Sequence, residues 1–251
     1  MRIVSLCPSL TELVFDLGRG ADLVGVTKFC VHPAGRVASI EKVGGTKNPK
    51  VERIVDLAPE LVLLNEEENR AEDAEALAAA GLRCHASFPR TAEETAAMVR
   101  SIGAALDRAP QAEAIAADIE SRAARVRAAA AGRPRVPYAC LIWRKPWMAA
   151  GADTFIHALL ALAGGENVFA GRVERYPEVS AGELAGADPA VVLLTSEPFP
   201  FGERHARELV RATALPRERF EFADGELLSW HGSRTPRGID YAEALLDAVR
   251  A

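Results

Sequence analysis

Large aromatic side chains mark several stretches that we expect to be loops. All three tryptophans of the chain, Trp143, Trp147 and Trp230, fall in such stretches, as does Tyr176. Loops usually shed large aromatic residues, because exposing these rings to water gains nothing. Aromatic rings together with a few convergent polar groups are what a concave small-molecule site needs. Any one ring could instead pack as a lid over its own part of the fold, but the three tryptophans together favour a binding site.

Polar side chains accompany the aromatic residues in the loops that follow predicted strands. The loops concerned are residues 29–32, 65–69, 88–90, 143–147, 176–178, 197–201 and 230–234. Open α/β sheets bind ligands in the loops beyond the carboxyl ends of their strands. The acidic run Glu66–Glu68 is also typical of a solvated helix entry, where carboxylates favour the helix dipole.

Signals for catalysis or metal binding are weaker. Ser233, His231 and Asp224 could form a hydrolytic triad, but no G-x-S-x-G elbow presents the serine. The paired glycines of GGTKNPK and AGGEN fit neither a P-loop nor a dinucleotide-binding loop. A metal site would need Cys30, His32 and His231 to converge, and a lone histidine near a strand end is more often a hydrogen-bonded structural group. We therefore assign no catalytic residue and leave any metal ligand unknown.

The composition is that of an ordinary globular protein. The chain has 251 residues, of which 49% are hydrophobic and 26% charged, and its formal net charge is −5. This length is enough for one large α/β domain or two lobes. The negative charge argues against a nucleic-acid-binding surface, which would need a basic face.

The sequence contains no export or membrane-insertion signal. No charged segment precedes an apolar stretch of signal-peptide length, and no apolar run approaches the roughly 18 residues of a membrane-spanning helix. The cysteines are scattered singly, which is weak evidence for a reducing compartment. We expect a soluble, cytoplasmic protein from the sequence as it stands. A chain whose export signal had been removed would look the same, so a periplasmic or other extracytoplasmic location is the alternative.

Predicted strands and helices alternate along the chain. Short apolar runs predict strands at residues 2–6, 24–26, 61–64, 83–86, 138–142, 190–194 and 219–221. Helical spacing and stop signals predict helices at residues 8–18, 51–57, 69–80, 91–106, 153–163, 203–211 and 241–249. Ser9 with Glu12, and Thr91 with Glu94, match capping boxes at two helix starts. This alternation predicts an α/β fold with mainly parallel sheets flanked by helices.

The longest predicted helix lies near the middle of the sequence, over residues 108–131. Pro110 stands near its start, and Gly132 and Pro134 follow its end. Because one α/β unit precedes it and another follows, we predict two lobes joined by one long helix. The boundaries we expect are an N-terminal lobe of residues 1–107, a connecting helix of residues 108–132 and a C-terminal lobe of residues 133–251. Taken alone, the segment would also suit an ordinary packed surface helix.

Two predicted strands have similar sequences. Residues 59–67 read PELVLLNEE and residues 189–197 read PAVVLLTSE. Aligned without gaps, Glu67 meets Glu197 just past the carboxyl ends of the two strands. The match suggests related halves with a carboxylate at the ligand-binding edge of each sheet, although this pattern is also common in unrelated α/β proteins.

The chain also resembles a known family. The matching stretches are SLCPSLTELVFDLG, LVGVTKFCVHP, KVGGTKNPKVERIVDLAPELVLL, AGADTFIHALLALAGGENVFA, YPEVSAGEL and SWHGSRTPR. They resemble the vitamin B12- and siderophore-binding proteins of ABC importers, the class III binding proteins also called helical backbone metal receptors. The resemblance covers nearly the whole chain in order. It implies two α/β lobes, a stiff connecting helix and a ligand held in the cleft between the lobes.

By position, the ligand-binding loops of these relatives correspond here to Phe29–Pro33, Glu66–Glu68, Tyr176 and Trp230. Tyr176 and Trp230 stand where the B12-binding relatives have aromatic side chains, which can flank a flat macrocycle. Combining the loops with the resemblance, we predict the following ligand contacts: Phe29, His32, Glu66, Glu67, Trp143, Arg144, Trp147, Tyr176, Glu197, Trp230, His231 and Arg234.

Two further expectations follow from the resemblance. The loop WRKPWMAAG is more charged than its counterpart in B12 binders, so Arg144 and Lys145 would favour an anionic ligand if they face the site. The family docks onto an ABC permease through one exposed carboxylate per lobe, and Glu72 and Glu203 lie in suitable predicted helices.

We therefore expect a non-enzymatic protein that holds a corrinoid, metal chelate or similar small molecule and requires no cofactor. We expect a monomer that neither binds nucleic acid nor spans a membrane, with an ABC permease as its candidate partner. The alternative is a cytosolic enzyme, metal-dependent or not, that reuses the same scaffold. A third reading is a module whose aromatic loops contact another protein.

Overall fold

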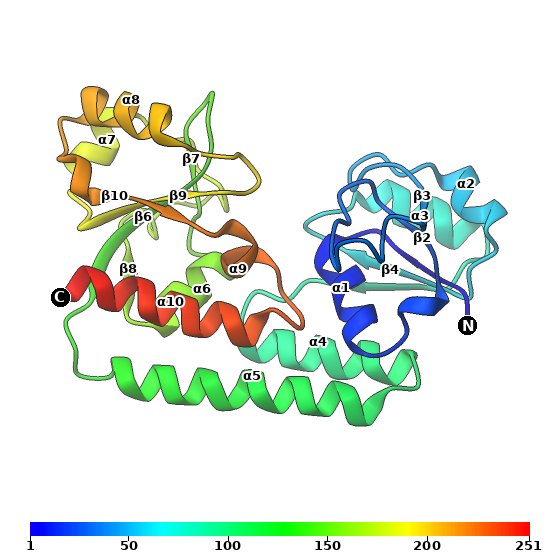
Figure 1. Ribbon diagram of the computed structural model, residues 1–251. Coiled ribbons are helices and arrows are strands. Elements are labelled where there is room, and N and C mark those ends of the chain that lie inside the picture. Colours follow the sequence, from blue (N-terminus) through cyan, green and yellow to red (C-terminus); the bar gives the residue numbers. More distant parts are fainter. The chain divides into compact units, whose positions relative to one another are not determined.

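The computed structural model describes residues 1–251, which divide by their contacts into two units (Figure 1). The N-terminal lobe comprises Met1–Pro89, Glu93–Asp118 and His231–Arg234, and the C-terminal lobe comprises Arg90–Ala92, Ile119–Trp230 and Thr235–Ala251. The division falls inside helix α5 (Ala109–Ala130), the long helix expected near the middle of the chain. The segment His231–Arg234 groups with the N-terminal lobe, which its place in the sequence does not suggest.

The N-terminal lobe is built on a five-stranded parallel sheet in the order β3-β2-β1-β4-β5. The strands are β1 (Ile3–Ser5), β2 (Leu23–Val26), β3 (Glu41–Lys42), β4 (Leu61–Asn65) and β5 (Cys84–Ser87). The helices are α1 (Pro8–Asp16), the 3-10 turn η1 (Gly20–Asp22), α2 (Val51–Asp56), α3 (Ala71–Ala79), α4 (Ala92–Ala105) and the first part of α5.

Alternating side chains of the central strands form the core of this lobe. Val4, Val62 and Leu64 are buried in one cluster with Ile54 of α2 and Leu77 of α3. Strand residues two apart point to the same face of a sheet, so this face is the one that α2 and α3 cover. The fully apolar runs are those of strands buried on both faces, as in parallel sheets.

The capping box expected at Ser9 and Glu12 is wrong. Helix α1 begins at Pro8 and its N-cap is Cys7, two residues before the expected cap. Proline suits this position because its missing N–H would be unpaired there anyway. Ser9 therefore lies inside the helix, where its hydroxyl bonds to other side chains, and Glu12 forms an ion pair with Arg234.

The C-terminal lobe has a second five-stranded sheet. Its strands are β6 (Val136–Trp143), β7 (Met148–Ala149), β8 (Gly165–Asn167), β9 (Val191–Thr195) and β10 (Phe220–Ala223). Strand β6 pairs in parallel with β8 and β9, β9 pairs in parallel with β10, and only β7 is antiparallel. The similar sequences noted above form β4 and β9. Each of these strands lies beside its lobe's central strand, which supports the idea of two related halves.

Helices flank this sheet as well. They are α6 (Phe155–Leu162), α7 (Ala181–Gly186), α8 (Glu203–Thr213), the 3-10 turn η2 (Arg217–Arg219), α9 (Gly225–Ser229) and α10 (Thr235–Arg250). Leu141, Val192 and Leu194 of the sheet form one buried cluster with Leu184 of α7 and Leu209 of α8. These observations confirm the α/β class with mainly parallel sheets. No helix is both long and apolar enough to cross a membrane.

The predicted long elements are present, and the shortest ones were missed. Strands β3, β7 and β8 and helices α7 and α9 were not predicted, because runs of two to six residues carry little periodicity. Helix α10 begins at Thr235, earlier than the start expected at residue 241.

Candidate functional site

The predicted site loops follow the carboxyl ends of parallel strands in each lobe. In the N-terminal lobe these are the segments after β2, β4 and β5, and in the C-terminal lobe those after β6 and β9. Parallel strands end at the same edge of a sheet, so the loops after these strands lie along one edge in each lobe.

The turn after β4 is organised by two buried asparagines. The side-chain oxygen of Asn65 accepts hydrogen bonds from the backbone N–H groups of Glu67 and Glu68, at 3.0 and 3.1 Å. Asn69 accepts from the backbone N–H of Asn65 and donates to two carbonyl groups. The predicted contact Glu66 is exposed and Glu67 is half-buried on this turn. We call the segment Asn65–Asn69 the asparagine turn.

The loop after β2 presents an aromatic side chain to solvent. Phe29 is 50% exposed, and the ammonium group of Lys28 lies 4.9 Å from its ring centroid. Cys30 is buried beneath, with its sulfur 3.1 and 3.2 Å from the hydroxyls of Thr11 and Thr27. The predicted contact His32 is half-buried in the same loop.

His231 is buried and Arg234 is largely buried, and both are bonded to side chains of the N-terminal lobe. His231 Nδ1 lies 3.0 Å from the hydroxyl of Ser9, and its Nε2 lies 2.8 Å from the amide nitrogen of Asn65. Burial lowers the pKa of His231, against the opposing effect of the Glu67 carboxylate. Arg234 forms a two-pronged ion pair with Glu12 at 2.5 and 3.0 Å. We call the segment His231–Arg234 the strap.

The metal site considered from the sequence does not assemble. No group of three or more His, Cys, Asp or Glu side chains could hold a metal ion. The Cys30 thiol is buried against hydroxyls, and burial raises its pKa. Both ring nitrogens of His231 already have protein partners. The triad of Cys30, His32 and His231 therefore lends no support to a metal-dependent enzyme.

Aromatic rings of the C-terminal lobe form a continuous cluster. Trp143, which is 41% exposed, meets Phe199 edge-on at 5.8 Å between ring centroids. Phe199 meets Phe201 at 4.9 Å, and Phe201 stacks on Trp147 at 6.1 Å. We call these four residues the aromatic cluster. The structure thus links two predicted contacts, Trp143 and Trp147, through two phenylalanines that were recognised only as part of the loop 197–201.

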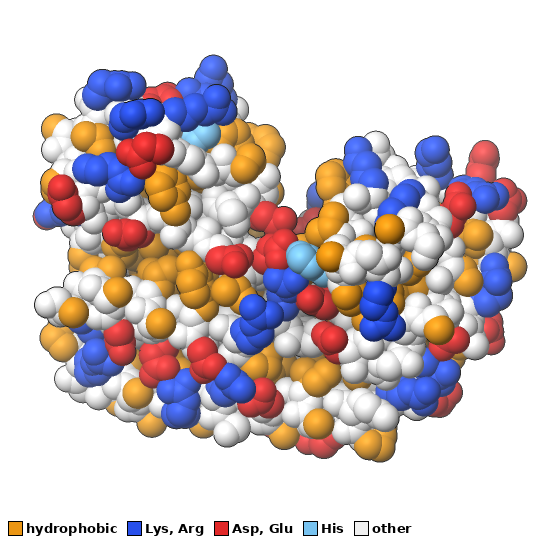
Figure 2. Space-filling model, viewed as in Figure 1, with side chains coloured by type: hydrophobic (Ala, Val, Ile, Leu, Met, Phe, Trp, Pro, Cys, Tyr) orange, Lys and Arg blue, Asp and Glu red, His pale blue; other side chains and the backbone are white.

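Arg144 is engaged by a carboxylate of its own lobe. Its guanidinium forms a fork with Glu208 of α8 at 2.7 to 3.0 Å and lies 5.5 Å from the Trp147 ring. Arg144, Lys145, Trp147 and Glu208 are among the residues that line a small open pocket of about 280 Å³. Figure 2 shows basic side chains gathered over α8, where Arg204, Arg207 and Arg211 are exposed.

Trp230 and Glu197 are paired within the C-terminal lobe. The indole N–H of Trp230 donates to the Glu197 carboxylate at 2.8 Å, and the ring is only 7% exposed. Gly225, at the start of α9, has no room for a side chain, since a Cβ there would lie 2.6 Å from the backbone nitrogen of Glu197. Tight packing at Gly225 therefore fixes the loop that carries the carboxylate.

Tyr176 lies on a segment that runs beside β7. Met148 and Glu178 form an antiparallel bridge, and the backbone N–H of Val179 donates to the carbonyl of Trp147. This pairing places the Tyr176 loop next to the Trp147 loop. The guanidinium of Arg175 lies 5.8 Å from the Tyr176 ring centroid.

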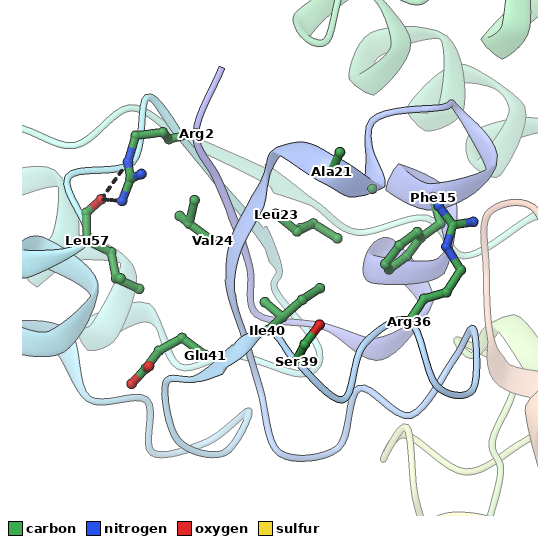
Figure 3. A pocket seen from close by; sticks show the side chains of 11 residues that line it. Arg2, Phe15, Ala21, Leu23, Val24, Arg36, Ser39, Ile40, Glu41 and Leu57 are labelled. Carbon is green, nitrogen blue, oxygen red and sulfur yellow. Dashed lines mark hydrogen bonds between the residues drawn. The ribbon is translucent and has the colours of Figure 1, made fainter.

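A groove of the N-terminal lobe lies away from these residues. Its volume is about 650 Å³, and it runs along β2 and the segment before β3 (Figure 3). Leu23, Val24 and Ile40 provide apolar side chains, and Arg2 is tied to the carbonyl of Leu57. None of the predicted ligand contacts lines it, so this groove is not part of the candidate site.

Comparisons with known proteins agree on one family. Residues 3–213 match the family model described as "Periplasmic binding protein". A vitamin B12-binding protein of Photorhabdus laumondii subsp. laumondii is 27% identical over 195 residues, covering 78% of this chain and 70% of that protein.

Two solved structures share the fold over nearly the whole chain. The periplasmic vitamin B12-binding protein of Vibrio cholerae has a TM-score of 0.87 at 21% identity, covering 99% of this chain and 97% of that one. A periplasmic heme-binding protein of Roseiflexus sp. RS-1 in its apo form has a TM-score of 0.82 at 27% identity, covering 99% and 98%.

Proposed function

From the premise that this chain belongs to the periplasmic binding protein family, we propose that it is a non-enzymatic receptor for one small molecule with a large flat ring system. A corrinoid is the first candidate and a metal chelate such as heme the second. The observation that carries the proposal is the aromatic cluster at the carboxyl edge of the C-terminal sheet. Aromatic faces stack on flat macrocycles, and Trp143 is exposed enough to do so.

The relatives support this class of ligand. One sequence relative binds vitamin B12 by its name, and a structure of similar fold at 27% identity is of a heme-binding protein. Both ligands are metal-containing macrocycles with a broad apolar face. An enzyme on the same scaffold finds no support among these relatives, which are binding proteins by their names.

The proposed contacts come from the loops of both lobes. From the N-terminal lobe they are Phe29, His32, Glu66 and Glu67, and from the C-terminal lobe Trp143, Arg144, Trp147, Tyr176, Glu197 and Trp230. His231 and Arg234 complete the set, but their polar atoms are bonded to the N-terminal lobe, which favours a role in holding the loops.

The ion pair of Arg144 with Glu208 bears on whether an anionic ligand would bind here. The Glu208 fork neutralises Arg144, so an anionic group on the ligand would have to meet Lys145 or compete for Arg144. A bidentate arginine–carboxylate pair is geometrically well matched. We therefore propose that stacking on the aromatic rings, rather than an ion pair, supplies most of the affinity.

An ABC permease is the proposed partner, and the proposed location is extracytoplasmic, in keeping with the periplasmic family. We further propose that the chain acts as a monomer. Detection of the protein in the periplasmic or the cytoplasmic fraction of cells that express it from its native start tests the location.

Titration of tryptophan fluorescence with cyanocobalamin, dicyanocobinamide and hemin tests the binding proposal. We expect saturable quenching by at least one of them with a stoichiometry of one, and loss of most of that signal in Trp143→Ala. The native protein should leave the bound molecule chemically unchanged. Conversion of the ligand to a new product would overturn the non-enzymatic assignment.

A further inference from the structure

His231 has a single protonation state that suits its surroundings. The oxygen of Asn65 accepts two backbone N–H groups, from Glu67 and Glu68, which fixes the orientation of the amide. The Asn65 NH₂ group therefore donates one hydrogen to the carbonyl of Ser87, at 3.0 Å, and directs the other at His231 Nε2, 2.8 Å away. Nε2 must carry a lone pair to accept this bond, so the proton of the neutral ring lies on Nδ1 and is donated to Ser9.

A second proton on this ring would break the arrangement. An Nε2–H would face the amide hydrogens of Asn65, and two donors would then oppose each other in a buried site. Asn65 cannot relieve this by turning over, because its NH₂ group would then face the backbone donors of Glu67 and Glu68. Protonated His231 can be accommodated only if the strap or the asparagine turn moves.

We propose that His231 is a positioning residue whose neutral ring holds the asparagine turn, and that acid releases this turn and weakens ligand binding. The part concerning the ligand rests on the function proposed above, because it takes the turn bearing Glu66 and Glu67 as a binding loop. We call the contacts of His231 with Ser9 and Asn65 the latch. They lie within the N-terminal lobe, so this part of the proposal does not depend on the ligand.

The charged groups around His231 do not reverse this expectation. Glu67 raises the pKa of His231, but burial is the larger influence and lowers it. On α1, Glu12 is neutralised by Arg234 of the strap itself. Asp16, also on α1, has a pKa that burial raises, and Glu68 acts on the nearby Cys7.

The direction of the pH effect follows from the lowered pKa. A released His231 takes up a proton near its ordinary pKa of 6.5, whereas the held ring does not. The state in which neutral His231 is bonded to Asn65 is therefore fully favoured above pH 6.5, and its population decreases as pH falls below this value. The loss is at most about tenfold in the equilibrium for each pH unit.

Nitrogen NMR of the full chain, without ligand, tests the latch first. At pH 7 we expect His231 to be neutral with its proton on Nδ1. A proton on Nε2, or a charged ring at that pH, would overturn the proposal. This measurement needs no variant, so it does not depend on a mutant that folds.

Amide hydrogen exchange at Glu67 and Glu68 provides the second readout, corrected for intrinsic rates. Their protection should fall between pH 7 and pH 5 in the native protein and stay flat in His231→Gln, whose amide oxygen can still accept from Asn65 and does not titrate. His85→Gln is the matched control, since His85 is also a histidine of this lobe with a pKa lowered by burial, and the fall should persist there. Equal pH profiles in the native protein and His231→Gln would overturn the latch.

Binding of cyanocobalamin or hemin at the two pH values completes the test. If either probe binds, its affinity should fall with pH in the native protein and much less in His231→Gln. Binding that is independent of pH would refute the link to the ligand and leave the proposed function standing. Failure of both probes to bind at any pH would count against the proposed function, while NMR and exchange still decide on the latch.

Discussion

The buried indole of Trp230 shows how one residue of the candidate site fixes the position of another. Its N–H is held by Glu197, so the ring has a fixed orientation. Sequence reasoning selected both residues as contacts, one as an aromatic residue near the end of the chain and one through its similarity to Glu67. It could not show that they bond to each other, because 33 residues separate them.

Replacing Trp230 by alanine should weaken binding of the ligand identified by titration at least about tenfold, equivalent to about 1.4 kcal/mol. Glu197 would lose the partner that orients its carboxylate, and the loop that carries this proposed contact would loosen. Calorimetric titration measures the change. Phe222→Ala is the matched control, because Phe222 is an exposed aromatic residue of the same lobe outside the candidate site. Equal losses in the two variants would contradict the assigned role of Trp230.

The ion pair of Glu12 with Arg234 should matter for stability. Both side chains are largely buried, at 17% and 10% exposure. Glu12→Gln leaves the guanidinium without its counter-charge, and we expect a loss of about 3 kcal/mol in the free energy of unfolding. Urea denaturation checks this value. Glu41→Gln removes the partner of Arg53 in a more exposed pair and should change stability little. Similar small effects at both sites would argue against the strap as a firm attachment.

At the scale of elements, helix packing depends on one glycine. Gly103 of α4 faces α5 so closely that a Cβ would lie 2.1 Å from the Cβ of Ala112. Replacing glycine by alanine inside a helix normally stabilises it by about 1 kcal/mol. We expect the opposite sign for Gly103→Ala, a loss of about 1–3 kcal/mol, because the two helices would be forced apart.

Gly186→Ala in α7 provides the comparison for this prediction. Nothing lies within 4 Å of a Cβ placed there, and the residue does not adopt a positive φ. Its effect should be neutral or mildly stabilising, by at most about 1 kcal/mol. Urea unfolding of the two variants side by side decides the matter, and a stabilised Gly103→Ala would refute the close packing of α4 on α5.

The capping box of α7 should be visible in the titration of Glu183. Its carboxylate accepts from the backbone and hydroxyl of Ser180 and pairs with Arg172, and these contacts lower its pKa to about 2. Their stabilising effect is present above the ordinary value of 4.5 and is lost as pH falls toward 2. In Ser180→Ala the pKa should move back toward 4.5, as carbon NMR of the side chain would show. An unchanged pKa would mean that the backbone N–H of residue 180 and Arg172 set it without the hydroxyl.

The sequence predicted the elements that are long and periodic, and it missed those that depend on contacts. The α5 helix and the buried strands β4 and β9 follow from apolar patterning and stop signals. The capping box at Ser180 was readable from S-x-x-E but was overlooked, whereas Ser9-x-x-Glu12 was wrongly given this role. At Ser9 the cap was misplaced because Pro8 occupies the first helical position, which makes Cys7 the N-cap.

At the scale of the whole molecule, strands alternating with helices on both sides of one long helical stretch predicted two α/β lobes joined by a helix. The sequence did not indicate that His231–Arg234 groups with the N-terminal lobe while its neighbours on both sides group with the C-terminal lobe. That grouping rests on side-chain bonds to Ser9, Asn65 and Glu12, which lie more than 150 residues away in sequence. Local sequence patterns cannot predict contacts between residues that are so far apart in the chain.

The central claim is that this chain binds one flat macrocycle and does not transform it. Native mass spectrometry of the purified chain, alone and after addition of cyanocobalamin, dicyanocobinamide or hemin, tests it most directly. We predict a one-to-one complex with one of these molecules, at the mass of the unaltered ligand, and a weaker complex in Trp230→Ala. A spectrum with only the free chain in all three mixtures, or a bound mass that shows a chemical change, would contradict the account.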